Sequence, residues 1–166
     1  MENKEVNDSR MYSLLVLYDM HTDFFSKALA GISDTDAHNR LNTKANHIAW
    51  IAGSLVQERF ELAKTLGIDH VSQSHELFKD HKGIQADIRY PSLKTYEADW
   101  KEISPGLKHA LQQLQPDLLN SSFDMMPDVQ MTYFDFISFV TYREANCIGQ
   151  IALWRRLLDY PAMNYM

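Results

Sequence analysis

Four polar residues stand inside an otherwise apolar stretch, residues 132–159, near the end of the sequence: Arg143, Glu144, Cys147 and Gln150. Arg143, Cys147 and Gln150 follow each other at intervals of one helical turn, so a helix places them on one side. Because the stretch is too apolar for a surface helix, these groups indicate either a functional site or a satisfied internal network. A guanidinium can receive a carboxylate or a phosphate, and a thiol beside it can act as a nucleophile.

A second set of polar residues lies in the helix expected over residues 43–66. His47 and Ser54 are seven residues apart and therefore share a face of that helix. Gly53, beside Ser54, permits the close approach of another backbone or of a ligand. If this helix packs against the C-terminal one, the two sets line one crevice. The candidate binding crevice consists of His47, Ser54, Glu58, Arg143, Glu144, Cys147 and Gln150.

Two kinds of chemistry are open for this crevice. In an enzyme, Cys147 would be the nucleophile, Arg143 one turn earlier would stabilise its thiolate, and His47 would be the base. In a binding protein, Arg143 would hold a small anionic ligand. Plainer structural roles are also open: an inert buried thiol, an internal ion pair of Arg143 with Glu58 or Glu144, and a serine that only lets two helices approach. The sequence assigns no catalytic residue.

Four helical stretches must position these residues. In each, apolar residues recur at the helical period, and Ser92 and Thr132 are suitable N-terminal caps. The stretches are residues 10–30, 43–66, 92–115 and 132–159. Ser104-Pro105-Gly106 predicts a kink or a restart in the third. With no convincing strand and no repeat, the sequence predicts an all-α four-helix bundle in one domain, residues 1–166.

The long connection over residues 67–91 bears on the order of the helices. A helix of about 24 residues is about 36 Å long, and about 25 connecting residues can retrace that distance. The second and third helices are therefore expected to be parallel, in an up-down-down-up order. His70, His75 and His81 of this connection have no spacing typical of a metal site and are expected to be solvated. His21, in the first helix, is expected at the edge of the core, bonded to a neighbouring helix.

Composition excludes several classes of protein. The chain has 166 residues, of which 45% are apolar and 23% charged, as in soluble globular proteins. A formal net charge of −6 argues against nucleic acid as a partner. One cysteine excludes an internal disulfide framework. No secretory signal and no apolar run of spanning length are present, so we expect a cytoplasmic protein without a membrane partner.

A surplus of large apolar residues predicts a homodimer. Each helix of a bundle needs one inward stripe, yet two of these helices carry large apolar residues around more than one side. The residues are Leu14, Leu15, Val16, Leu17, Phe134, Phe136 and Phe139. Apolar surface beyond one stripe usually buries against a partner, and a second copy of the chain is the partner expected here.

Two segments carry a resemblance to a known family. The segment NHIAWIAGSLVQERFELAKTLG contains Asn46, Trp50 and Gly53 at the spacing Asn-x-x-x-Trp-x-x-Gly. The segment YREANCIGQIALWRRLLDYPAMNYM contains Glu144, Gly149, Gln150 and Ile151, followed by two arginines. Together they resemble the DinB-like family of bacterial four-helix-bundle proteins, over most of the chain. Many members of that family are described as metal-dependent hydrolases or thiol-dependent transferases.

The sequence departs from that family at the metal site. Members that bind a metal use one histidine after the glycine of the second helix and an HxxxH pair in the fourth. Carried over to this chain, the three places fall on Ser54, Arg143 and Cys147, and the guanidinium of Arg143 would repel a divalent cation. We therefore expect a protein without a metal or other cofactor, acting in binding or interaction. Metal-dependent hydrolysis, thiol-dependent transfer, catalysis by Cys147 and metal binding through His47 with loop histidines remain alternatives.

Overall fold

The computed structural model describes residues 6–166, and these are mostly helical, as predicted. The long helices are α1 (Arg10–Leu29), α3 (Ile48–Thr65), α5 (Leu93–Gln112) and α7 (Tyr133–Leu157). The short helices are α2 (Asp34–Ala37), α4 (His75–Phe78), η1 (Lys79–His81) and α6 (Pro116–Asn120). Two short strands, β1 (Ser122–Met126) and β2 (Val129–Thr132), form an antiparallel pair.

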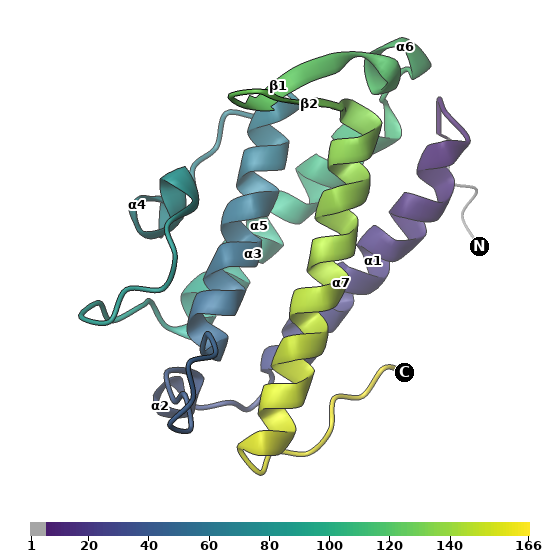
Figure 1. The fold of residues 1–166 in the computed structure, drawn as a ribbon. Coiled ribbons are helices and arrows are strands. Elements are labelled where there is room, and N and C mark those ends of the chain that lie inside the picture. The colour runs from purple at the N-terminus through teal and green to yellow at the C-terminus, as the bar shows by residue number, and fades with distance from the viewer. Residues whose placement is uncertain (1–5) are drawn as a thin grey trace.

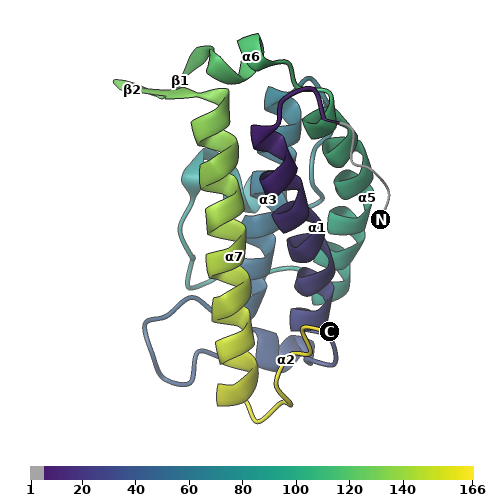
Figure 2. The ribbon, with the colours of Figure 1, turned by 90° about the vertical axis from the view of Figure 1, so that its right-hand side faces the viewer.

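The long helices lie side by side around one apolar core (Figures 1 and 2). α1 packs against α5 and α7, and α3 packs against the same two helices. α1 and α7 run in one direction, while α3 and α5 run in the opposite one (Figure 1). The parallel α3 and α5 are joined by the segment that contains α4 and η1, which returns along the outer side of α3 (Figure 1). α3 and α7 are antiparallel neighbours. Two consecutive residues of α3 can therefore pair, in reversed order, with two consecutive residues of α7.

Side-chain caps fix the starts of α5 and α7, as the sequence predicts. The Ser92 side chain accepts a hydrogen bond from the backbone N–H of Thr95. The Thr132 side chain accepts one from the backbone N–H of Asp135, and its hydroxyl donates to the Asp135 carboxylate at 2.8 Å. Each cap satisfies backbone groups that a helix end leaves without a partner.

The second long helix begins later than predicted. It was expected from residue 43 but starts at Ile48, because His47 is its cap. The backbone N–H of Trp50 donates to Nδ1 of His47 at 3.1 Å. The residues before the cap form a turn instead, in which the Arg40 guanidinium donates to two backbone carbonyl groups of residues 44–45. The functional consequence is that His47 lies at the helix end and not along its inner face.

The third long helix passes through Pro105 without a break, so the predicted restart is wrong. Proline removes one backbone donor, and side chains around it hold the adjoining turn. The Ser104 hydroxyl donates to the backbone carbonyl of Trp100 at 2.5 Å, and the Tyr18 hydroxyl donates to the Ser104 carbonyl at 2.8 Å. The bond from Tyr18 ties α5 to α1 at the level of the proline.

The prediction that the chain has no strand is wrong for the segment before α7. Ser122 pairs with Thr132 and Met126 with Val129, and the intervening turn contains Asp128 at a φ of 64°. The Phe123 ring anchors this hairpin on the helical core, with its centroid 5.4 Å from that of Phe136 in α7. The hairpin therefore covers one end of the α3–α7 contact (Figure 1).

The C-terminal segment docks back on the helices. Met163 is buried in the core cluster. The Arg155 guanidinium donates to the backbone carbonyl groups of Ala28, Ala30 and Pro161, which ties the end of α7 to the end of α1. Within residues 6–166, no helix combines the length and the hydropathy that crossing a bilayer requires.

Candidate functional site

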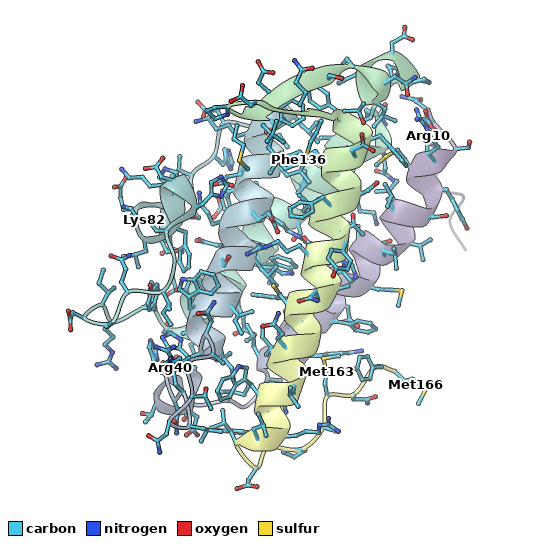
Figure 3. All side chains as sticks on the ribbon, in the orientation of Figure 1. Arg10, Arg40, Lys82, Phe136, Met163 and Met166 are labelled. Atoms are coloured by element: carbon cyan, nitrogen blue, oxygen red, sulfur yellow. The ribbon has the colours of Figure 1, made fainter. Side chains whose placement is uncertain are left out.

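A pocket of about 280 Å³ lies between α3, α7, the hairpin and the connection that carries α4. We call it the α3–α7 pocket. Its lining combines aromatic and methionine side chains with a small set of charged groups: Trp50, Ser54, Gln57, Glu58, Glu61, Phe78, His81, Lys82, Met125, Met126, Phe136, Phe139 and Arg143. Phe136 reaches it from α7 and Lys82 from the connection (Figure 3). A mostly apolar pocket with a few convergent polar groups is the usual form of a small-molecule site.

Arg143 joins the two helices on one side of this pocket. Its Nη1 donates to Oε2 of Glu58 at 2.8 Å, and its Nη2 donates to Oγ of Ser54 at 2.6 Å. Of the two internal partners that the sequence left open for Arg143, Glu58 and Glu144, the structure pairs it with Glu58. The pair is partly accessible, since 27% of the Arg143 side chain and 14% of the Glu58 side chain are exposed.

Burial raises the pKa of Glu58 to about 7, although the neighbouring Arg143 acts in the opposite direction. The free-energy cost of removing the carboxylate from water exceeds the favourable interaction with Arg143, as is usual for a buried ion pair. The carboxyl groups of Glu144 and Glu61 raise the pKa of Glu58 further. Glu58 therefore exchanges its proton near neutral pH, where an ordinary glutamate stays ionised.

We expect Glu58 to make the folded protein less stable as the pH rises. Its pKa is about 4.5 when exposed and about 7 in the folded state, so the folded state holds the extra proton between these values. The stability of the wild type relative to Glu58→Gln should fall by about 2 kcal/mol between pH 5 and pH 8. Urea denaturation at both pH values measures this difference. Glu102→Gln on the exposed side of α5 is the control, and an equal pH response of the two variants would contradict the prediction.

Cys147 lies beside the ion pair but has the properties of a structural thiol. It is buried, and burial raises the pKa of its thiol, while Arg143 opposes that change. A raised pKa lowers the fraction of thiolate, which is the nucleophilic form. Ser54, Arg143 and Cys147, the three places that the family resemblance assigns to metal ligands, thus lie close together, with Arg143 bonded to Ser54 and electrostatically coupled to Cys147.

Glu144 faces away from the pocket, into the core. Nε and Nη2 of Arg59 donate to its two carboxylate oxygens at 2.5 and 3.0 Å, and Nδ1 of His21 lies 3.1 Å from Oε2. Burial acts to raise the pKa of Glu144, but Arg59 and His21 together hold it below its usual value. The core histidine expected at position 21 is thus bonded to a neighbouring helix, as predicted.

Arg59 is the residue that sequence reasoning missed. Its side chain is fully buried, with the guanidinium carbon 3.5 Å from the centroid of the Trp100 ring and 4.0 Å from that of Tyr18. Glu58 and Arg59 are consecutive on α3, while Arg143 and Glu144 are consecutive on α7, and each acid pairs with the opposite arginine. The sequence signal for Arg59 was the pair of dipeptides Glu-Arg and Arg-Glu, which lie in reversed order on two antiparallel helices. One pair lies in the core, and the other lies in the pocket.

Besides Glu144, the candidate residues His47 and Gln150 also lie away from the pocket. His47 lies at the cap of α3, where it lines a separate surface depression of about 560 Å³ near His38 and Arg40. Burial, followed by the charge of His38, lowers the pKa of His47 to about 4. Gln150 is exposed on α7 and donates to the Asn146 side chain at 2.7 Å.

The histidines of the connection are not gathered into a metal site. In the part of the chain that the structure describes, no group of three or more His, Cys, Asp or Glu side chains is placed to hold a metal ion. His70 is exposed, as predicted, and lies 3.7 Å from Glu102. His75 departs from the prediction, because it is partly buried and its Nδ1 accepts a hydrogen bond from Gln57 at 2.9 Å.

No protein-family model, no curated protein and no solved structure matches this chain.

Proposed function

We propose that this protein binds a small organic molecule in the α3–α7 pocket and does not use metal-dependent catalysis. The single observation that carries the proposal is the arrangement of Arg143 on the pocket wall. A guanidinium has five N–H donors. Within residues 6–166 the guanidinium of Arg143 forms only two hydrogen bonds, to Glu58 and Ser54. The pocket of about 280 Å³ therefore offers a partly exposed cation with spare donors, beside aromatic and methionine side chains.

We also propose that the four long helices form an up-down-down-up bundle of the DinB-like type. The parallel course of α3 and α5 and the segments quoted above support this assignment. The donors at the three metal positions do not fit the family's metal, because a hydroxyl, a guanidinium and a protonated thiol stand where three imidazoles would be required. The permanent charge of Arg143 would lie within that ligand shell.

Catalysis by Cys147 is the weaker candidate. The thiol is buried and its pKa is raised, and the imidazole of His47 lies in a different depression and caps a helix through its Nδ1. A cysteine nucleophile is commonly activated by a histidine base or by a lowered pKa, and the geometry of Cys147 provides neither. Its burial is instead explained by a structural role, as a small side chain between α3 and α7.

We expect an uncharged fluorescent probe, 1-aminoanthracene, to bind the protein saturably at one site. Met126→Glu should weaken this binding about tenfold, because it places a charge on the apolar wall of the pocket. Val129→Glu is the matched control, since Val129 lies on the same hairpin, is exposed to a similar degree and does not line the pocket. Fluorescence titration measures both affinities.

Equal loss of probe binding in the two hairpin variants, or no saturable binding to the wild type, would contradict the proposed function. A stoichiometric divalent metal in protein purified without a histidine tag would contradict the metal-free part of the proposal.

We further propose that the protein is a homodimer that buries the outer faces of α1 and α7. Two of the residues behind the dimer prediction, Leu15 and Phe136, are instead buried in the core of the chain itself. Leu17 stays 39% exposed, and the structure adds other exposed apolar side chains: Met20 on α1 at 42%, and Tyr142 and Leu153 on α7 at 67% and 50%. Tyr142 and Leu153 are eleven residues apart, about three helical turns, so they share one face. Exposed apolar side chains on one face can bury against the same face of a second copy.

Leu153→Glu is expected to convert the dimer to a monomer, because a two-fold contact would bring two added carboxylates together. Sedimentation equilibrium measures the mass. Glu102→Gln, on the exposed side of α5, should leave the dimer unchanged. A wild-type mass equal to one chain at all concentrations would rule out the dimer.

A further inference from the structure

Building on the proposed function, we propose that the ligand of the α3–α7 pocket is a carboxylate with an apolar or aromatic body, and that its carboxylate replaces Glu58 as the partner of Arg143. The ligand carboxylate would then be the anchor, and the body would fill the space between the aromatic and methionine side chains.

The arginine is already arranged to bind a carboxylate. Glu58 offers one oxygen to Nη1 at 2.8 Å, and Nη2 is turned to the Ser54 hydroxyl at 2.6 Å. A guanidinium binds a carboxylate best through two parallel N–H bonds, which the Glu58 side chain does not make here. A free carboxylate in the pocket can approach both nitrogens, and the Ser54 hydroxyl can rotate to donate to it. The incoming group thus has the same chemistry as the group it displaces, with better geometry.

The side chains that line the pocket determine which kind of ligand body fits beside the carboxylate. Phe136, Phe139 and Phe78 supply aromatic surface, and Met125 and Met126 of the hairpin supply flexible thioethers. Methionine adapts to ligands of irregular shape, and apolar burial contributes about 25 cal/mol per Å². The charged groups elsewhere in the lining are Glu61, His81 and Lys82.

Displacement of Glu58 leaves a buried carboxyl group without its cation, so Glu58 must take up a proton. The groups that act on it support this outcome: Glu61 on its own helix and Glu144 on α7 are both acidic, and Cys147 is a protonated thiol. Arg143 on α7 is its cationic partner, while Lys82 and His81 reach the pocket from the connection. Since burial already raises the pKa of Glu58 to about 7, the proton is available near neutral pH.

Calorimetric titration of the full chain with 3-phenylpropanoate and with neutral 3-phenylpropanamide tests the inference. We expect the acid to bind at least about tenfold more tightly than the amide, because only the acid pairs with Arg143. Titration at pH 8 in phosphate and in Tris should reveal the uptake of close to one proton. The affinity for the acid should be about tenfold weaker at pH 8 than at pH 6, since binding then requires protonation of Glu58.

Two variants separate the parts of the mechanism. Glu58→Gln should abolish both the proton uptake and the pH dependence while the acid still binds. Arg143→Gln should bring the affinities for the acid and the amide to about the same value. Binding of acid and amide with equal affinity by the wild type would overturn the inference and leave the pocket as a site for neutral molecules. Binding of the acid without proton uptake would also overturn it. If neither compound nor 1-aminoanthracene binds, the proposed function itself fails.

Discussion

Replacement of Arg59 by methionine is expected to lower the free energy of unfolding by about 3–5 kcal/mol, because it leaves the buried Glu144 carboxylate without its cation. Arg59 donates to both oxygens of Glu144, and its Nη1 also donates to the hydroxyl groups of Thr22 and Ser104 at 2.9 and 2.7 Å. In the variant, α1, α5 and α7 therefore each lose a hydrogen bond to α3. Urea denaturation followed by circular dichroism at pH 7 measures the loss.

The double variant Arg59→Met with Glu144→Leu should recover much of that loss. Apolar groups of similar size can replace a buried ion pair at little cost, whereas a single buried charge without a partner is strongly unfavourable. Asp23→Asn is the control, because it breaks the exposed pair of Asp23 and Lys27 and should change stability by no more than about 0.5 kcal/mol. If Arg59→Met lowers the free energy of unfolding no more than this control does, the buried ion pair of Arg59 and Glu144 does not stabilise the core.

Gly53→Ala is expected to destabilise the protein by about 3 kcal/mol, at the upper end of the usual range for overpacking. An added Cβ would overlap Cζ of Phe78 and would lie 2.7 Å from Cζ of Tyr96. Both rings are buried, at 4% and 0% exposed, so neither can move aside freely. Because Phe78 also lines the α3–α7 pocket, the variant should weaken binding of 1-aminoanthracene as well.

Gly106→Ala is the matched control for this prediction. Gly106 is also inside a long helix, but its nearest atom is Cδ1 of Ile68 at 4.0 Å. An alanine there should stabilise the helix by up to about 1 kcal/mol, since glycine is the poorer helix former. Thermal unfolding should therefore move in opposite directions for the two variants. If the unfolding temperatures of both variants shift in the same direction, the prediction is wrong. Phe78 would then not be tightly packed against α3 at Gly53.

Features that depend on neighbouring residues could be read from the sequence. The caps Ser92 and Thr132 act on residues three positions away, so the local pattern contains both partners. The hairpin before α7 was missed because its strands are only five and four residues long and mostly exposed, which leaves little periodic signal. The start of α3 was misplaced because a histidine is an unusual cap, and the helical pattern continues upstream of it.

Features of the site that depend on distant residues could be predicted only in part. The need for an acidic partner of Arg143 follows from the cost of an unpaired buried charge, and Glu58 meets it. The role of Arg59 could not be foreseen in the same way, because Glu144 is 85 residues away and an arginine in an amphipathic helix normally faces water. His47 was placed in the crevice because the helix was extended too far toward the N-terminus.

The most direct test of the central claim is a methyl NMR titration of protein labelled at the methionine methyl groups, with 3-phenylpropanoate as the ligand. We expect the signals of Met125 and Met126 to shift saturably, because both side chains line the α3–α7 pocket. The signals of Met11 and Met163, which are buried elsewhere in the core, should stay in place. Saturable shifts confined to methionines outside the pocket, or no shift at any ligand concentration, would contradict the assignment of this pocket as the binding site.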